Sequence, residues 1–330
     1  MELNRRTTIV DIASVVGVSR QTVSRAMNDM PGINADTRRR VLEAARNLGY
    51  RPSRFGRGLV KRDQQTVGLM IDNLTNPYYP ELAAAIVAQA ARLNWSVLLL
   101  DTSSVEDQRA LLTAFASQAD VLIGYVYLDL AELDAILPGV PVVGIDAAAG
   151  ADAHAWGGVE FELEPGVQEA IDHLQERGVR RPLMLDNSSA GSPTERARVI
   201  VRHWADRGVE MPVIATDGHD ANSAERAATA QLELIRDADA IMCFNDYVAL
   251  GAMKALHRAG IRVPESVRMV GLDGIAAGEY TTPALTTLGV DIQVAAEAAV
   301  SIARSLVEPG TFAGSPWARV SYRLIVRESA

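Results

Sequence analysis

From Thr66 onward, short apolar runs alternate with segments of helical periodicity, and this alternation restricts the fold more than any other feature of the chain. The runs of strand length are TVGLMI, WSVLLL, VLIGYV, PVVGI, RPLML, PVIAT, AIMCF, VRMVGLD, LTTLGV and YRLIV. Strands that alternate with helices build parallel sheets whose crossover helices cover both faces. We therefore expect an α/β core of two doubly wound parallel-sheet lobes over residues 66–330.

A purely helical pattern precedes this core. Thr8 is placed to cap a short helix that Gly17 ends, and Ser19 is placed to cap a second helix over residues 20–27. Two helices around a tight turn that contains glycine make a helix-turn-helix. The sequence therefore predicts a small all-α helix-turn-helix head over residues 1–50.

A third helix is expected to pack against this pair. Asn34 is placed to cap it, and helical spacing continues from Ala35 to about Leu48. The positions predicted to face the core of the head are Ile9, Ile12, Ala13, Val16, Val23, Ala26, Met27, Val41, Leu42, Ala45 and Leu48.

Charge divides sharply along the chain, although its net value is only −9. Residues 1–62 hold 13 Lys and Arg against five Asp and Glu, a balance of +8, whereas the remainder holds 19 basic and 36 acidic residues. A polyanion is repelled by a body with a balance of −17, so any contact with nucleic acid belongs to the N-terminal segment.

The second helix of a helix-turn-helix enters the major groove, where Arg and Gln have the donors that match guanine and adenine edges. Arg20, Gln21 and Arg25 are therefore our candidates for base readout, and Thr22 and Ser24 suit phosphate oxygens. The alternative is that the two arginines are only solvated surface charges, which the balance of +8 disfavours.

The segment DIASVVGVSRQTVSRAMND, followed by INADTRRRVLEAARNLGYRPSR, closely resembles the head of the lactose/galactose repressor (LacI/GalR) family. The resemblance implies that Arg20 and Gln21 contact bases and that residues 53–60 form a hinge helix on DNA. Leu59 matches the leucine that wedges into the minor groove, unless it is only a linker residue. Gly56 and Gly58 depart from the family, because each costs a helix about 1 kcal/mol relative to Ala.

These observations give the domain boundaries and the DNA-contacting set. The head spans residues 1–50, the hinge and linker residues 51–65, and the core residues 66–330. Arg54 and Arg57 are expected to reach phosphates. The full set of predicted DNA contacts is Thr8, Ser19, Arg20, Gln21, Thr22, Ser24, Arg25, Asn28, Arg54, Arg57 and Leu59.

Polar residues follow the strand-like runs of the core repeatedly, and ligands of open α/β sheets bind beyond the carboxyl ends of the strands. The residues in such positions are Asp72, Asn76, Tyr78, Tyr79, Asp101, Asp146, Asn245, Asp246 and Asp273. An alternative stays open: Asp72, Asp101 and Asp246 can serve only as helix caps, and Tyr78 can belong to the core.

The motifs NPYYPEL, AIMCFNDYVALGAMKALHRAGIRVPESVRMVGLDG and PALTTLGVD resemble the periplasmic-binding-protein-like core that the same family carries. The resemblance implies that a tyrosine of NPYYPEL stacks on an effector and that an arginine bridges to it from the second lobe. The predicted effector set is Asn76, Tyr78, Tyr79, Asp146, Arg196, Asn245, Asp246 and Asp273. Planar carboxylates, a guanidinium and aromatic rings suit the hydroxyls and C–H faces of a sugar. Ala147 follows Asp146 where many relatives have Arg.

Other function classes find no support in the sequence. It contains no GxxxxGK[ST], no GxGxxG after a strand and no HExxH, its five histidines have no ligand spacing, and its lone Cys243 lies in an apolar run typical of a buried strand. We therefore expect no enzymatic activity, no cofactor and no metal site.

The remaining alternative is a periplasmic-type binding protein, which the core alone would allow. That class is exported, whereas MELNRRTTIVD lacks the apolar run of a signal peptide and no segment approaches a membrane span. The sequence predicts a cytoplasmic, sequence-specific DNA-binding transcription repressor. We expect a homodimer that binds a pseudo-palindromic double-stranded operator under allosteric control by a sugar-like small-molecule effector.

Overall fold

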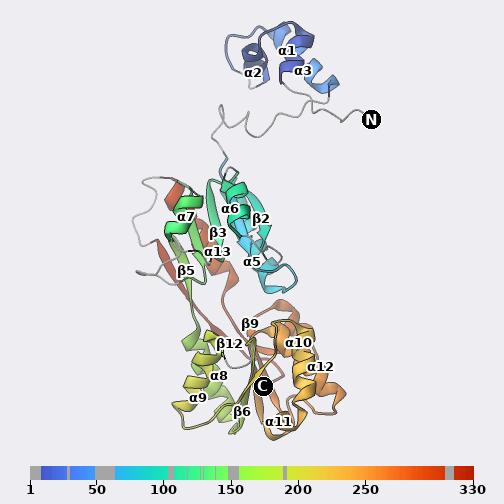
Figure 1. Cartoon of the computed structure of the whole chain (residues 1–330), viewed down its shortest axis with the longest axis vertical. Helices are drawn as coiled ribbons and strands as arrows, with labels where there is room; N and C mark the ends of the chain where they lie inside the picture. The colour runs from blue at the N-terminus through green and yellow to red at the C-terminus, as the bar shows by residue number, and fades with distance from the viewer. Residues whose placement is uncertain are drawn as a thin grey trace. The chain divides into compact units, whose positions relative to one another are not determined.

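The computed structural model describes residues 9–27, 30–48, 64–102, 108–116, 118–126, 128, 130–137, 139–147, 156–188, 192–308 and 316–330. Its contacts divide the chain into two compact units, Met1–Gln65 and Thr66–Ala330 (Figure 1). Within the described ranges, every helix is too short or too polar to cross a lipid bilayer.

The first unit contains the helix-turn-helix that the sequence predicts. Its helices are α1 (Ile9–Val16), α2 (Arg20–Met27) and α3 (Ala35–Asn47). Gly17 ends α1 in the left-handed conformation, with φ of 71°. Ser19 Oγ accepts the Thr22 amide at 3.0 Å, and Asn34 Oδ1 accepts the Thr37 amide at 2.7 Å, which satisfies free N–H groups at the starts of α2 and α3.

Two residues that the sequence predicts to face the core of this unit are exposed instead. Leu42 and Leu48 are 37% and 36% exposed, while Ala44 is buried in their place. Because a helix turns about 100° per residue, position 42 points away from the face that carries Val41 and Ala44. Leu48 lies just beyond the last residue of α3.

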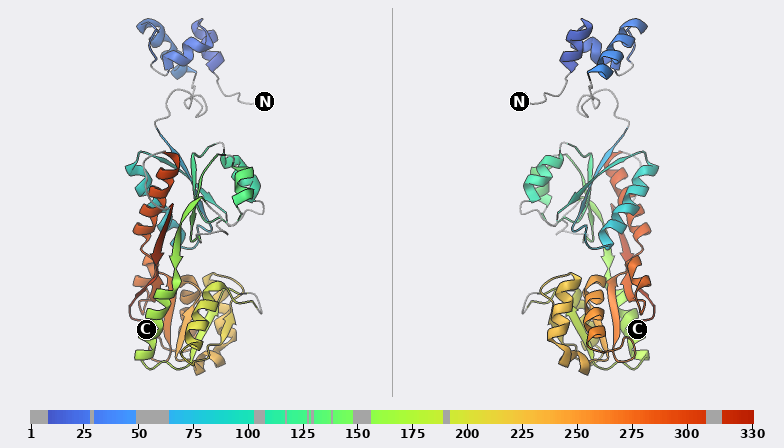
Figure 2. Two further views of the ribbon diagram at one scale, coloured as in Figure 1. Left: turned by 90° about the vertical axis from the view of Figure 1, so that its left-hand side faces the viewer. Right: turned by 90° about the vertical axis from the view of Figure 1, so that its right-hand side faces the viewer.

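The first lobe of the second unit is a parallel sheet in the order β11-β5-β4-β3-β1-β2. Its strands are β1 (Thr66–Ile71), β2 (Ser96–Asp101), β3 (Val121–Gly124), β4 (Val142–Ile145), β5 (Gly157–Glu162) and β11 (Trp317–Ser321). Its helices α5 (Tyr78–Arg92) and α13 (Ile292–Val307) cover one face, and α6 (Gln108–Ala116) and α7 (Leu130–Ile136) cover the other (Figure 2). The strands β5 and β11 were not predicted from the sequence, because they lie near glycine-rich or polar segments.

The second lobe has the strand order β12-β10-β9-β8-β6-β7. Its strands are β6 (Pro182–Asp186), β7 (Val213–Ala215), β8 (Ala240–Cys243), β9 (Arg268–Asp273), β10 (Thr286–Gly289) and β12 (Arg323–Ile325). Its helices are α8 (Leu163–Glu176), α9 (Glu195–Ala205), α10 (Ala221–Ala230), α11 (Leu232–Asp237), α12 (Asp246–Arg258) and the 3-10 helix η1 (Ala276–Tyr280). In contrast to the predicted parallel arrangement, β12 runs antiparallel to β10.

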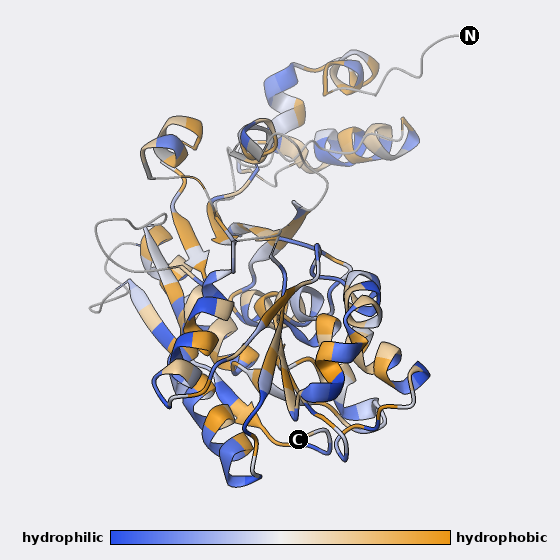
Figure 3. Cartoon of the chain, turned by 60° about the horizontal axis from the view of Figure 1, so that its bottom comes forward, coloured by the Kyte–Doolittle hydropathy of each residue, from blue (hydrophilic) through white to orange (hydrophobic). Residues whose placement is uncertain are grey.

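Side-chain alternation along β6 explains why helices cover both faces of this sheet. Leu183 and Leu185 pack into the apolar cluster under α10 and α12, whereas Met184 points to the opposite face. Cys243 is 1% exposed and contacts Met269, which confirms its predicted place in a buried strand. Figure 3 shows apolar strands and helices whose hydrophilic residues lie on their outer sides.

The chain passes between the lobes after β5, after β10 and again between β11 and β12. Tyr322 occupies the last crossover, and its amide donates to Glu162 O at 2.9 Å, so neighbouring crossover segments are joined. One continuous apolar cluster includes Val67 from the first lobe and Trp204 from the second. The two sheets therefore share a core, and their carboxyl-terminal strand ends approach one another.

Candidate functional site

The first turn of α2 presents the residues that the sequence predicts for base readout. Arg20 and Gln21 are exposed, and Ser19 Oγ is 2.8 Å from Thr22 Oγ1 within the cap of the helix. Ser24 is half-buried on the same helix. The predicted contacts Thr8, Asn28, Arg54, Arg57 and Leu59 lie outside the described residues.

Arg25 differs from Arg20, because its guanidinium is engaged inside its own unit. Its Nη2 donates to Pro31 O at 2.6 Å and lies so close to Gly32 that a Cβ there would meet it at 3.1 Å. This bond ties α2 to the loop before α3. This bond helps to position α2, and the role of Arg25 in base readout stays a prediction.

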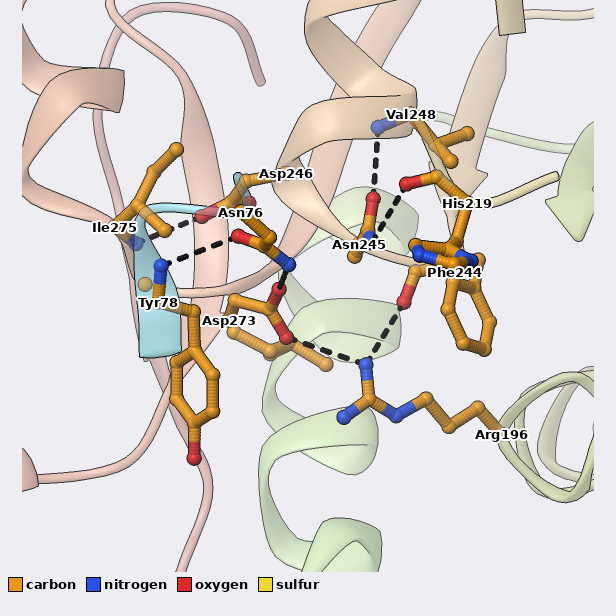
Figure 4. A network of polar contacts seen from close by, with 12 residues as sticks. Asn76, Tyr78, Arg196, His219, Phe244, Asn245, Asp246, Val248, Asp273 and Ile275 are labelled. Atoms are coloured by element: carbon orange, nitrogen blue, oxygen red, sulfur yellow. Dashed lines mark hydrogen bonds and ion pairs between the residues drawn. The ribbon is translucent and has the colours of Figure 1, made fainter. Parts of the chain in front are cut away.

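In the second unit, polar side chains from both lobes meet in a group that we call the inter-lobe cluster: Asn76, Tyr78, Asp146, Arg196, Asp273 and Tyr322. Asp273 ends β9 and is at its centre. Its Oδ2 accepts from Asn76 Nδ2 at 3.2 Å, and its Oδ1 accepts from Arg196 Nη1 at 3.2 Å (Figure 4). Asn76 belongs to the first lobe and Arg196 to the second, so one carboxylate joins both lobes.

Arg196 lies in the first turn of α9 and is held on several sides. It donates to Phe244 O at 3.1 Å and to the Tyr322 hydroxyl at 3.4 Å, and its guanidinium carbon lies 5.0 Å from the centroid of the Phe244 ring. Its side chain is 24% exposed and that of Asp273 is 4% exposed. Such a largely buried, multiply bonded pair is rigid and presents its remaining N–H groups in a fixed direction.

The tyrosines of NPYYPEL have different environments. Tyr78 is 3% exposed and accepts a hydrogen bond from the Tyr125 hydroxyl at 3.0 Å. Its ring therefore belongs to the core, which is one of the two alternatives that the sequence left open. Tyr79 is half-buried, contacts both other rings edge-on at 5.3 Å, and donates to Asp72 at 3.4 Å. Tyr125 was not among the predicted residues, because the predicted run VLIGYV included it, whereas β3 ends at Gly124 and Tyr125 directly follows the strand.

Asp146 stands directly after β4 in the left-handed conformation, with φ of 53°. Its side chain is accessible to water, yet surrounding protein atoms raise its pKa by desolvation, and Arg196 partly offsets this rise. Burial likewise raises the pKa of Asp273, against the opposing effects of Arg196 and Asn76. Asp146 therefore lies within electrostatic reach of Arg196 at the carboxyl edge of the first sheet.

Asn245 and Asp246 serve the second lobe itself. Asn245 Oδ1 accepts the Val248 amide at 2.7 Å and caps α12, and its Nδ2 donates to His219 O at 3.1 Å. Asp246 is 0% exposed, and its two oxygens accept from Thr287 Oγ1 at 2.6 Å and from the Ile275 amide at 2.8 Å. The expectation that Asp246 contacts an effector does not fit a carboxylate that is buried and bonded in this way.

Further hydrogen bonds between the lobes involve residues that sequence reasoning missed. Asn73 Nδ2 lies 3.4 Å from His219 Nε2, and the Ala276 amide donates to Glu81 Oε1 at 3.2 Å. No sequence motif marks these residues, because their pairing depends on how the lobes meet. Among the described residues, no group of three or more His, Cys, Asp or Glu is arranged to hold a metal ion.

Comparison with known proteins identifies both parts of the chain. Residues 8–53 match the model of the bacterial regulatory proteins of the lacI family, and residues 171–330 match a periplasmic binding protein-like domain. The ribose operon repressor of Halalkalibacterium halodurans is 30% identical over 286 residues, which cover 86% of this chain and 85% of that one.

Two further similarities extend over most of the chain. The transcriptional regulator AscG of Escherichia coli is 28% identical over 98% of each chain. The crystal structure of a LacI family transcriptional regulator from Arthrobacter sp. FB24, in complex with lactose, has a TM-score of 0.75 at 30% identity and covers 81% of this chain and 99% of that one.

These likenesses confirm the predicted family, whose members are transcription regulators. The helix-turn-helix unit and the two-lobed core agree with it in architecture. The chain belongs to the LacI family of bacterial DNA-binding transcription regulators.

Proposed function

We propose that this regulator is a homodimeric repressor that binds a pseudo-palindromic operator and that a sugar-like effector at the inter-lobe cluster controls this binding. Residues 1–50 form the DNA-binding head, residues 51–65 the hinge and linker, and residues 66–330 the effector-binding and dimerisation core. The observation that carries the effector site is Asp273, which bonds Asn76 of the first lobe and Arg196 of the second.

The chemistry of the cluster supports a polyhydroxylated ligand. A hydroxyl both donates and accepts, so vicinal hydroxyls can satisfy a carboxylate and a guanidinium together. Asp146, Arg196, Asp273 and Asn76 supply such groups, and Tyr79 is the half-buried ring beside them. The names of the relatives point in the same direction, since one regulates a ribose operon and one is seen with lactose.

The head supports operator binding through side chains that remain accessible. Arg20 and Gln21 at the exposed start of α2 are the proposed base contacts, with Ser19, Thr22 and Ser24 beside them for the phosphate backbone. The proposed set is completed by Arg25, Thr8, Asn28, Arg54, Arg57 and Leu59. Two heads in a dimer would read two half-sites, which explains why the operator should be close to a palindrome.

The effector would control operator binding by changing the angle between the two lobes. The bond between Asn76 and Asp273 is replaced or rearranged when a ligand takes up the Asp273 oxygens, and the lobes then prefer another arrangement. Coupling of this kind between two sites amounts to about 1–3 kcal/mol in typical allosteric proteins. The preferred lobe arrangement would be transmitted through the dimer to the two hinges.

The test combines operator selection with a ligand screen. The full chain is used to select duplexes from a random pool. Its affinity for the selected duplex is then measured across salt concentrations, with and without sugars and polyols. A chain lacking residues 1–62 is expected to show the same rise in unfolding temperature with the active sugar, and to have no measurable affinity for the duplex. Operator affinity retained by this truncated chain, or the absence of any palindromic preference in the full chain, would contradict the proposal.

A further inference from the structure

The start of α9 is fastened to the end of β6 by a buried carboxylate outside the inter-lobe cluster. Asp186 is the last residue of β6 and is 0% exposed. Its Oδ2 accepts the Thr194 amide at 2.9 Å, and its Oδ1 accepts the Thr194 hydroxyl at 2.6 Å. Both oxygens of the carboxylate therefore hold the same residue, which fixes Thr194 in position and in orientation.

Thr194 in turn determines where α9 begins. It is the N-cap residue in an extended conformation, and its Oγ1 accepts the Ala197 amide at 3.2 Å. The hydroxyl thus donates to Asp186 and accepts from the first turn of α9 at the same time. Arg196 is the second residue of this turn, so these bonds place its backbone.

The backbone of Asp186 is held from the other side by Thr216. Its carbonyl oxygen accepts the Thr216 amide at 2.9 Å and the Thr216 hydroxyl at 3.1 Å, and Thr216 is 3% exposed directly after β7. Burial of a carboxylate costs free energy that a neutral side chain would avoid, whereas hydrogen bonds to a charged acceptor are shorter and stronger. The carboxylate therefore places α9 precisely at a position where a neutral residue could also have met the cap.

Arg196 is consequently fixed at both ends of its side chain. At the far end, its guanidinium donates to Phe244 O at 3.1 Å and to Asp273 at 3.2 Å. Because the side chain has a limited reach, a displacement of the first turn of α9 must lengthen one of these bonds or turn the guanidinium. Groups that contact a ligand need to be held within about 0.5 Å of their productive position.

We propose that Asp186 and Thr194 are positioning residues for effector binding, because they hold Arg196 in the place and direction from which it contacts the effector. The inference rests on the proposed function, in which Arg196 belongs to the effector site. Both residues act through Arg196. The affinity for the effector therefore depends on a bond between β6 and α9 within the second lobe, whereas operator affinity without effector does not.

Thr194→Val tests this role, since valine keeps the shape of threonine and removes the hydroxyl. Ribose, galactose and lactose are titrated into the full chain, and the sugar that binds most tightly is used for all variants. Thr194→Val should bind it at least about tenfold more weakly, because a hydrogen bond to a charged group and a helix cap are both lost. Thr194→Ser restores the hydroxyl and should bind within about twofold of the unsubstituted chain. Operator affinity without sugar should be equal in all three proteins.

A second measurement reports on Arg196 without any sugar. The arginine Nε–Hε resonances of the full chain are recorded by heteronuclear NMR, and the signal of Arg196 is identified by its loss in Arg196→Lys. This signal should shift or broaden in Thr194→Val and return in Thr194→Ser. Asp186→Asn replaces the charged acceptor and keeps its shape, so it should also shift the signal, even if Thr194→Val folds too poorly to be measured.

Asp239→Asn is the matched control. Asp239 is likewise a carboxylate of the second lobe that accepts two backbone amides, those of Arg180 and Arg181, each at 2.9 Å. It precedes β8 at the amino ends of the parallel strands, whereas Asp186 lies at the carboxyl end of β6. Its substitution should alter neither the affinity for the sugar nor the Arg196 signal.

The outcomes separate this inference from the proposed function. If Thr194→Val binds the sugar as tightly as the unsubstituted chain, the positioning role is overturned while the sugar site stands. An equal loss of affinity in Asp239→Asn also overturns it, because the loss would then reflect general destabilisation. If none of the three sugars binds, the proposed sugar-responsive function fails, and the Arg196 signal decides the inference. A signal unchanged in Thr194→Val and Asp186→Asn overturns it, and a shift confined to these variants supports it.

Discussion

Asn76 Nδ2 and Asp273 Oδ2 lie 3.2 Å apart across the two lobes, and the same carboxylate binds Arg196 through its other oxygen. Asp273 adopts φ of 131°, which non-glycine residues rarely do. A ligand that binds this buried carboxylate would therefore affect contacts with both lobes.

Replacing Asp273 with Ala should impair both stability and effector response. The substitution leaves the largely buried Arg196 without its carboxylate, which costs about 2–4 kcal/mol in the free energy of unfolding. Denaturant unfolding measures this cost, and operator release by the active sugar should be lost while operator binding remains. Asp172→Ala is the control: it breaks a pair with Arg207 in which Asp172 is 62% exposed, so its effect should stay below about 1 kcal/mol. An unchanged sugar response in Asp273→Ala would remove this residue from the site.

Arg20→Ala and Gln21→Ala should weaken operator binding without unfolding the head. Both residues are exposed, and loss of one bidentate base contact costs about 1–3 kcal/mol, or roughly five- to 150-fold in affinity. The loss should be confined to the selected operator and small on random duplexes, as measured by fluorescence anisotropy. Arg39→Ala serves as the comparison, because Arg39 is an exposed arginine of α3 that pairs with Asp36 and Glu43. Equal losses on every duplex would assign Arg20 and Gln21 to phosphates.

The stability of the core should depend on pH through Asp246. Burial raises the pKa of Asp246 to about 7, and the Asp273 carboxylate acts in the same direction, against hydrogen bonds from Thr287 and Ile275. In the unfolded chain an Asp titrates near 3.9, so the folded state binds this proton more tightly. The contribution to stability is therefore complete below about pH 4 and declines by roughly 1.4 kcal/mol per pH unit until the pH passes about 7.

Asp246→Asn isolates this contribution from that of the other carboxylates. An amide can still accept from the Ile275 amide and can donate to the Thr287 hydroxyl, so the packing is preserved. Relative to the unsubstituted protein, the variant should gain stability at pH 8 compared with pH 5 in denaturant titrations. A difference between the two proteins that is the same at both pH values would show that Asp246 is ionised throughout.

Gly251→Ala in α12 should destabilise the second lobe, although Ala is the better helix former by about 1 kcal/mol. A Cβ at this position would lie 2.0 Å from Ala221 O, at the contact between α10 and α12. The helices must separate to admit it, and overpacking of this kind costs about 1–3 kcal/mol. Thermal unfolding should show the loss, while Lys254→Ala on the exposed side of α12 should change little. A stabilised Gly251→Ala would mean that the two helices move apart freely.

Much of the fold was predictable because it is encoded locally. The helices of the head follow from caps at Ser19 and Asn34 and from a left-handed Gly17, and each of these acts within a few residues. In the core, the buried residues of α13 recur at helical spacing, among them Ala295, Ala299 and Ile302. The strands β5 and β11 were missed because their residues are only partly apolar, and their pairing with each other comes from opposite ends of the core.

The site was predictable in part, and the exceptions have a common cause. The rule that ligands bind beyond the carboxyl ends of parallel strands selected Asn76, Asp146 and Asp273 as candidates. The structure joins Asn76 and Asp273 to Arg196 by hydrogen bonds, and Arg196 also acts on the charge of Asp146. The same rule also selected Asn245 and Asp246, which turn out to cap and join elements of one lobe. Position at the end of a strand does not reveal whether a polar group is already bonded by a neighbouring element.

The sequence by itself determined the family, the helix-turn-helix, the alternation of strands and helices, and the separation of positive charge from the acidic body. These properties depend on spacing and composition within short segments, which can be read without coordinates. Only the tertiary structure decided that Asp246 is buried and bonded within its own lobe and that Arg25 donates to Pro31 O. It also decided that Tyr125 contacts Tyr78, that Tyr322 contacts Arg196 and that Asn73 lies beside His219. Such pairings join residues far apart in the chain, and they depend on strand order and on the way the two lobes meet.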